Sequence, residues 1–296
     1  MAVTQEFQSS RPTVPELSAR CPQVPEEVIR RYVERFPKHY FDTFKAAEIE
    51  AHLTALASLS PRDPVRVRIR RTTDGAEVTF LSYDAPGEFS VLTGLLSATG
   101  FDIASGDVFT EGRNGSAAGG ARADAATDND GGSGGGRGAG SRRSAGSGRG
   151  RRPGHGARSW YRRAGSFPAP AQQPPSRFIV DRFRGTARAP FEAWSHELTA
   201  KAEEFLGLLH GGTQESYDEV KRRTTEEVAS ALDRFPVRQE RALYPVEVDV
   251  EPGETTTRMR VSGVDTPFFL YALSSALVLH DMSVERVEIH TRGEQI

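Results

Sequence analysis

The sequence predicts an α+β protein that contains two copies of one small module, the second of them incomplete. Two observations carry this prediction. The chain repeats itself at an offset of 181 residues, and in both copies the hydropathy period changes from two to that of a helix at matching places. Folded sequence lies on both sides of a Gly- and Arg-rich stretch at about residues 112–175.

Composition limits the class of protein. The 296 residues are 37% apolar, enough for one or two domains of ordinary size. The longest apolar run, residues 267–279, is shorter than the roughly 20 residues that cross a bilayer, and residues 1–10 lack a signal-peptide pattern, so we expect a cytoplasmic protein. Cys21 is the single cysteine and has no neighbours at metal-ligand spacing, so neither zinc nor redox chemistry is expected.

The insert at residues 112–175 is basic, whereas the rest of the chain is acidic. Residues 131–175 hold nine Arg and no Asp, Glu or Lys, so the net charge of -2 leaves about -11 for the remainder. Of the 29 glycines, 17 lie between Gly112 and Gly165, and such a stretch buries too little apolar surface to fold. We therefore expect disorder. A shifted reading frame would produce the same abrupt change.

The Arg tract has a second interpretation, because it lies beside Trp160 and Tyr161. Arginines neutralise phosphates and aromatic rings stack on bases, so an RNA-binding role stays an alternative. The acidic remainder argues against a nucleic-acid partner.

The internal repeat aligns residues 64–112 with residues 245–293 without a gap. Nine of the 49 aligned pairs are identical, which alone is weak, but both copies predict the same succession of elements. Residues 65–70 and 246–250 alternate between apolar and charged side chains, as in a strand with one solvated face. The identical pairs are Pro64/Pro245, Val65/Val246, Val67/Val248, Asp84/Asp265, Pro86/Pro267, Leu92/Leu273, Leu96/Leu277, Thr110/Thr291 and Gly112/Gly293.

In each copy a turn leads to a second strand, at residues 77–83 and 258–264, that ends at Asp-x-Pro. Asp84 and Asp265 are expected to cap the following helices. Each helix carries one apolar stripe and leads into a strand, at residues 101–110 and 282–291.

After the insert the first copy continues with a strand at residues 177–184 and a helix that has one apolar face. With one further strand, β-α-β-β-α is the ferredoxin-like plan, an antiparallel sheet with two helices on one face. The second copy lacks the third strand and second helix, so either the gene product is truncated or another segment or chain covers the exposed edge. The apolar face of the first-copy helix comprises Phe191, Trp194, Leu198, Phe205, Leu208 and Leu209.

These elements divide the chain. Packing helices are predicted at residues 25–36, 46–59 and 217–234. The expected organisation is a helical segment (1–60), a first module in two parts (61–111 and 176–212) around the insert (112–175), a helical linker (213–240) and a truncated second module (241–296).

The first copy reads Phe80-Leu-Ser-Tyr-Asp-Ala-Pro-Gly-Glu-Phe89, then Leu95-Leu-Ser-Ala-Thr-Gly-Phe-Asp-Ile103 and Gly106-Asp-Val-Phe-Thr110. These residues resemble the strand, Asp-x-Pro-Gly turn, helix and second strand of ACT domains, regulatory modules that bind amino acids. Two such modules preceded by residues 39–52 are similar to the carboxy-terminal region of PII uridylyltransferases, and related modules accompany glutamine synthetase adenylyltransferases.

The resemblance implies a sensor of glutamine or a similar amino acid in nitrogen control. In that family, catalysis belongs to an upstream nucleotidyltransferase domain and a metal-binding HD domain, and neither motif occurs in this sequence. A non-catalytic regulator and a regulatory piece of a nucleotidyltransferase therefore both stay open. We expect no catalytic residue, no metal and no cofactor, and a homodimer or a nucleotidyltransferase partner is compatible with the pattern.

The Asp-x-Pro turns are the candidate ligand sites. A strand that leads directly into a helix leaves free backbone N–H groups at the positive end of the helix dipole, and these suit a carboxylate. Gly87 would let a ligand approach the backbone closely, whereas Phe268 occupies the equivalent position, so the first turn is favoured. Plain helix caps without a ligand are the alternative. The candidate residues are Asp84, Ala85, Pro86, Gly87, Glu88, Phe89, Asp265, Thr266, Pro267 and Phe268.

Overall fold

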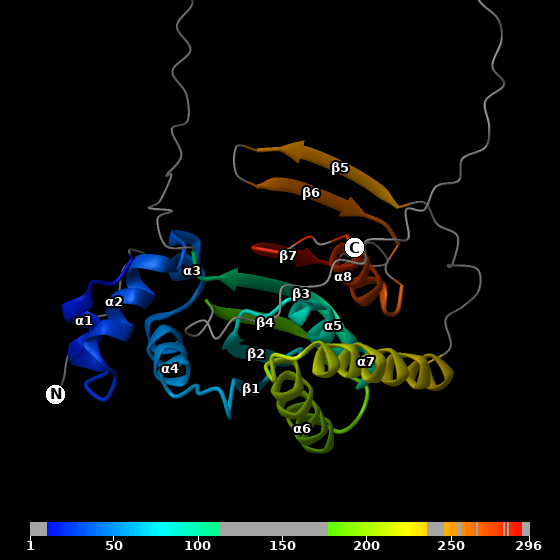
Figure 1. Cartoon of the computed structure of the whole chain (residues 1–296), viewed down its shortest axis with the longest axis horizontal. Helices are drawn as coiled ribbons and strands as arrows, with labels where there is room; N and C mark the ends of the chain where they lie inside the picture. Colours follow the sequence, from blue (N-terminus) through cyan, green and yellow to red (C-terminus); the bar gives the residue numbers. More distant parts are fainter. Residues whose placement is uncertain are drawn as a thin grey trace, which may run out of the picture. The chain divides into compact units, whose positions relative to one another are not determined.

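The structure is a computed structural model that describes residues 11–112, 177–235, 246–253, 256–264, 266–280, 282 and 284–291. It is a mixed α+β arrangement around a five-stranded antiparallel sheet (Figure 1). In spatial order the strands are β1 (Val65–Thr72), β2 (Gly75–Tyr83), β4 (Phe178–Ala187), β3 (Phe101–Thr110) and β7 (Arg286–His290).

Strands β3 and β4 bring the two sides of the predicted insert together. Thr110 pairs with Ile179, and the Glu111 backbone N–H donates to the Phe178 carbonyl at 2.8 Å. Apart from Gly112, the insert predicted at residues 112–175 lies outside the described residues. β3 and β4 are thus direct neighbours in the sheet, although Glu111 and Phe178 are 67 positions apart in the sequence.

One face of this sheet packs against α5 (Glu88–Ala98) and α6 (Phe191–Leu209). The predicted apolar face of α6 is confirmed at Trp194, Leu198 and Phe205, which are buried with Val78 and Phe80 of β2. A longer helix, α7 (Gln214–Arg234), packs against α5 and α6. It begins with a Thr213 capping box in which the Thr213 side chain accepts from the Ser216 N–H.

Helices also cover the second face of the sheet, and the packing helices predicted at residues 25–36 and 46–59 lie there. Leu81, Phe109 and Val180 lie on the second face and pack against four short helices. The physical reason is that the central strands are apolar on both faces, and β2 is buried along almost its whole length. The four helices are α1 (Val14–Arg20), α2 (Glu26–Arg35), α3 (Lys38–Thr43) and α4 (Ala46–Ala57).

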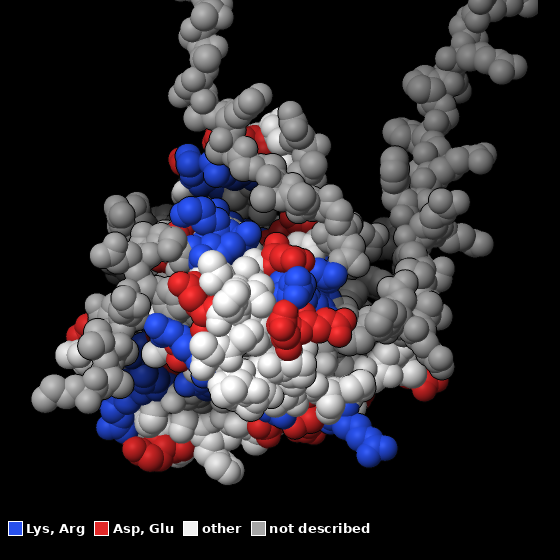
Figure 2. Space-filling model, turned by 90° about the vertical axis from the view of Figure 1, so that its left-hand side faces the viewer, with Lys and Arg blue, Asp and Glu red and all other residues white. Residues whose placement is uncertain are grey.

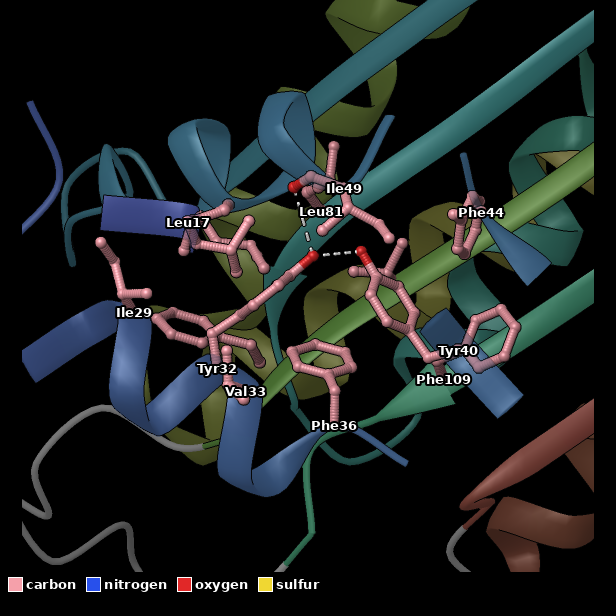
Figure 3. Close-up of a cluster of buried hydrophobic side chains, with 14 of the residues drawn as sticks. Leu17, Ile29, Tyr32, Val33, Phe36, Tyr40, Phe44, Ile49, Leu81 and Phe109 are labelled. Atoms are coloured by element: carbon pink, nitrogen blue, oxygen red, sulfur yellow. Dashed lines mark hydrogen bonds between the residues drawn. The ribbon is translucent and has the colours of Figure 1, made fainter. Parts of the chain in front are cut away.

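This second core is rich in aromatic rings whose polar atoms are paired (Figure 3). The hydroxyls of Tyr32 and Tyr40 point toward one another and form a hydrogen bond. Tyr40 also bonds to Nδ1 of His52 at 2.8 Å. Burial lowers the pKa of His52 to about 3, so this imidazole is neutral at physiological pH.

The second copy forms β5 (Glu247–Pro252), β6 (Thr257–Ser262), α8 (Phe269–Leu279) and β7, but these strands do not form one sheet. β5 and β6 make a separate two-stranded sheet, and β7 pairs with β3 of the first copy. In the first copy, β4 joins β2 to β3. Within the described residues the second copy has no counterpart of β4, so β6 and β7 stay in separate sheets.

The β3–β7 register relates the two copies by a local two-fold axis. Asp107 pairs with Glu288, its own equivalent at the 181-residue offset, while Gly106 pairs with Ile289 and Val108 with Val287. Helices α5 and α8 meet on the same axis, where the equivalent hydroxyls of Thr93 and Ser274 lie 3.0 Å apart. The three-dimensional pairing therefore supports the repeat that was found in the sequence.

Candidate ligand-binding site

The first Asp-x-Pro turn joins β2 to α5 and is held by contacts within the chain. The Asp84 backbone N–H donates to the Arg177 carbonyl at 2.7 Å, and the Arg177 guanidinium donates to Oδ2 of Asp84 at 2.5 Å. The residue that caps α5 is Gly87, in a left-handed conformation, and no side chain caps this helix. The expectation that Asp84 is the helix cap is therefore wrong, because its carboxylate is directed to Arg177.

A carboxyl group of the protein itself already occupies this turn. Glu88 is buried, and its Oε2 accepts the backbone N–H of Ala85 at 3.1 Å, while its Oε1 bonds to the Ser82 hydroxyl. Burial raises the pKa of Glu88 well above its usual range. The N–H of Ala85, one of the groups expected to bind a ligand carboxylate, is thus already paired.

Gly87 adopts a φ of +81°, and a Cβ at this position would lie 3.3 Å from the Tyr217 hydroxyl of α7. The ring of Tyr217 therefore covers the turn on the side where a ligand was expected to approach. Pro86 and Phe89 complete the turn, and Phe89 stacks on Phe183 at a centroid distance of 6.3 Å.

Replacing Gly87 by alanine should lower the free energy of unfolding by about 1–2 kcal/mol, because a left-handed conformation is unfavourable for any residue with a Cβ. Chemical denaturation would measure the change. Gly207 is the matched control, since it lies within α6 with open space around it, and Gly207→Ala should raise stability by about 0.5–1 kcal/mol. Equal effects of the two substitutions would contradict the strain at Gly87.

The second turn has the same backbone conformation with a different side chain. Phe268 caps α8 with a φ of 66° and is the one non-glycine residue with a positive φ in the described part of the chain. A bulky residue in this conformation costs about 1–3 kcal/mol. Its ring packs against Ala98, Val228 and Ala231, which offsets this cost. Asp265, the preceding candidate, lies outside the described residues.

A pocket of about 210 Å³ lies at this second turn, between the two copies. One wall is the second turn and the start of α8, and the other is the end of α5 and the start of β3. Arg188 and Phe235 complete the lining. Of the predicted site residues, the structure brings Thr266, Pro267 and Phe268 to this pocket together with Ser97, Gly100, Phe101, Asp102, Ile103, Phe269 and Leu270.

A basic side chain, Arg188, and an acidic side chain, Asp102, both line the pocket. The guanidinium of Arg188 lies 4.6 Å from the centre of the Phe235 ring and forms no ion pair with an acidic side chain among the described residues. Its backbone N–H bonds to the Gly100 carbonyl at 3.0 Å, which fixes the Arg188 backbone beside the pocket. Asp102 and Arg188 are both exposed, and Ser97 is half-buried. A guanidinium without an acidic partner among the described residues and a carboxylate that lines the same pocket suit a small zwitterion.

A second cluster of titratable groups lies beneath the first turn. Asp181 of β4 is buried, and neither carboxylate oxygen has a hydrogen-bond partner among the described residues. Burial and the nearby Asp84 raise its pKa well above the usual range. Nε2 of His210 is likewise buried without such a partner, and burial lowers the pKa of His210 to about 4. His210 is therefore uncharged near neutral pH, and burial favours the protonated form of Asp181 over its carboxylate.

Replacing Asp181 by asparagine should stabilise the protein, and by more at pH 8 than at pH 4. An acid whose folded-state pKa is raised contributes its full stability below its unfolded pKa of about 3.9, and that contribution is lost as the pH rises. Asparagine does not titrate, so the difference should grow with pH. Denaturant midpoints at several pH values measure it, and a difference independent of pH would contradict a buried, neutral Asp181.

The described residues hold no metal-binding cluster, and the face shown in Figure 2 has no broad basic surface. No group of three or more His, Cys, Asp or Glu side chains among the described residues could hold a metal ion. On the face shown in Figure 2, basic and acidic side chains lie interspersed. No helix within the described ranges is long and apolar enough to cross a membrane.

Comparison with known proteins found no match: no family model, no curated protein and no solved structure is similar to this chain. Local motif analysis identified the second turn but missed Ser97, Asp102, Arg188 and Phe235. The signal that could have found Ser97 and Asp102 is the repeat itself, since a two-fold axis through the third strands places the turn of one copy beside the other copy.

Proposed function

We propose that this chain is an amino-acid-sensing regulatory protein with two ferredoxin-like modules of the ACT type, the second incomplete. The sequence resemblance of residues 80–110 supports this proposal, as do the two-fold register of β3 with β7 and the matching left-handed caps at Gly87 and Phe268. The ligand that we favour is glutamine, and nitrogen control is the process that the resemblance suggests.

The observation that carries the proposal is the pocket between the second turn and the start of β3. Its volume of about 210 Å³ is below the roughly 300–1,000 Å³ of sites for drug-sized ligands, so it suits a free amino acid. Arg188 would bind the α-carboxylate and Asp102 the α-ammonium group. Ser97 and Thr266 remain to bind a polar side chain such as the amide of glutamine.

Regulation follows from the position of the pocket, because each copy supplies one wall. A ligand that contacts both walls has higher affinity for the arrangement in which the walls are close together, and it shifts the population toward that arrangement. The β3–β7 pairing and the α5–α8 contact are the elements that would change or tighten.

Calorimetric titration of the whole chain with glutamine tests the proposal, with glutamate and other amino acids as controls. Selective binding of glutamine is expected. No heat with any amino acid, from a chain shown by circular dichroism to be folded, would contradict the proposal.

The regulator could also be one part of a PII uridylyltransferase or glutamine synthetase adenylyltransferase, with its nucleotidyltransferase domain encoded elsewhere. Residues 39–52, which resemble the segment before the tandem modules of the uridylyltransferases, favour this second candidate. Reading the coding DNA on both sides distinguishes the two, since an uninterrupted nucleotidyltransferase reading frame would support an enzyme part.

A further inference from the structure

The β5–β6 hairpin has an apolar face that no described residue covers. Val248 pairs with Val261, and Val250 pairs with Met259, so these side chains share one face, together with Val246. Val248 and Val250 are each 55% exposed, and Val246 is 47% exposed. The opposite face carries charged residues such as Asp249 and Arg260, which pair across the strands. The hairpin is therefore built as one side of a core that lacks its other side.

The first copy shows what covers the same face. At the 181-residue offset, Val246 corresponds to Val65, which is 1% exposed, and Met259 corresponds to Val78, which is fully buried. In the first copy α6 packs on this face of β1 and β2. No counterpart of α6 exists among the described residues of the second copy. The uncovered surface thus has the shape that a helix covers elsewhere in the same molecule.

A strand is missing from the same place. β4 lies between β2 and β3 and is antiparallel to both. Their counterparts, β6 and β7, have no partner on the edge that β4 fills in the first copy, as far as the described residues show. Unpaired edges of this kind accept an added strand.

We propose that the second copy binds a strand followed by an amphipathic helix, supplied by a polypeptide segment that lies outside residues 1–296. The strand enters between β6 and β7, antiparallel to both, and the helix covers Val246, Val248 and Val250. This inference does not rest on amino-acid binding, because the repeat and the exposed hairpin carry it.

The charged residues of β5 and β6 indicate which side chain the entering strand must carry. In the first copy, the Glu77 carboxylate of β2 accepts a hydrogen bond from Arg184 of β4 at 2.7 Å and another from Arg70 of β1 at 2.7 Å. In the second copy both signs are reversed, since Glu77 is replaced by Arg258 and Arg70 by Glu251. The entering strand therefore needs an acidic residue opposite Arg258, where β4 has Arg184.

Composition and charge exclude three other occupants of this face. The segment at residues 113–176 is rich in glycine and arginine and poor in large apolar residues, so it does not supply the apolar face of a helix. The β4–α6 segment of a second copy would place Arg184 against Arg258, and it would leave its own first copy incomplete. A homotypic pairing of two β5 edges would bring Glu247, Asp249 and Glu251 against one another.

A peptide with the sequence of residues 177–210 is the probe, because it contains a strand and helix that already cover this fold. It is compared with the same peptide carrying Arg184→Glu. Each is labelled and titrated against the whole chain by fluorescence anisotropy. We expect the Arg184→Glu peptide to bind at least 10-fold more tightly, and hydrogen exchange to slow at the amides of β6 and β7.

Variants of the chain make the test specific. Arg258→Glu should reverse the preference, so that the unmodified peptide binds more tightly, and Val250→Asp should weaken both peptides by at least 10-fold. Both positions are exposed, so neither substitution is expected to unfold the chain. Equal affinity for the two peptides, absence of binding, or a dimer of the chain alone that Val250→Asp dissociates would overturn the proposal.

Discussion

Replacing Arg188 by alanine should weaken glutamine binding by about 10- to 100-fold. A hydrogen bond between ionised groups contributes about 1.5–3 kcal/mol, and each 1.4 kcal/mol is a tenfold change in Kd. The exposed guanidinium lies over the Phe235 ring and has no acidic partner among the described residues, so its loss should cost the fold little. Calorimetry measures the affinity, and thermal unfolding without ligand confirms that the variant is folded.

Arg71 offers a matched control for this substitution. Its guanidinium lies over the Phe191 ring at 4.6 Å, much as Arg188 lies over Phe235, and it pairs with Glu192 at 2.7 Å outside the pocket. Arg71→Ala should leave glutamine affinity unchanged. Arg188→Lys should bind with intermediate affinity, because an ammonium keeps the charge but not the planar pair of donors. Equal affinities of the wild-type and Arg188→Ala proteins would exclude the pocket as the carboxylate site.

Replacing Glu111 by alanine should lower the free energy of unfolding by about 3–5 kcal/mol, the range measured when one partner of a buried ion pair is removed. The Glu111 side chain is fully buried, and both oxygens accept from Arg31 at 2.6 Å. Oε2 also accepts the backbone N–H of Phe178 at 2.9 Å. The Glu111 carboxylate thus links α2 to the ends of β3 and β4. Its removal takes away the acceptor of the Arg31 guanidinium and of the Phe178 N–H.

Two further variants isolate the contribution of this ion pair. Glu111→Gln keeps an acceptor for the Phe178 N–H and should cost less than alanine. Glu26→Ala removes an exposed pair with Arg30 and should change stability by at most about 1 kcal/mol. Urea denaturation of all three compares them directly. A loss for Glu111→Ala no larger than that for Glu26→Ala would show that the link between α2 and the sheet is dispensable.

Local patterns predicted most strands and helices of the fold. The period-two run at residues 65–70 and the segment predicted after the helix at residues 101–110 are strands, and the stripes of α5 and α6 face one core. The helices α1 and α3 were not predicted, because helices of 7 and 6 residues are too short for a clear period. The pairing of β7 with β3 was missed because strand partners depend on contacts between distant residues, as between Asp107 and Glu288.

The candidate site was only partly predictable for the same reason. The turns at residues 84–89 and 265–268 are visible in the sequence, but the groups that distinguish them are not. Glu88 and Tyr217 occupy the first turn from within the fold, whereas the second turn opens on a pocket whose other wall is the first copy. Only the folded arrangement shows Arg188 beside the second turn.

Hydrogen exchange of the whole chain with and without saturating glutamine tests the central claim most directly, since it reports both binding and its place. Ligand in the pocket should slow exchange at residues 97–103 and 266–270, the two walls, and leave residues 84–89 unchanged. Slower exchange at residues 84–89 alone, or no change at any described amide, would contradict a glutamine site between the two copies.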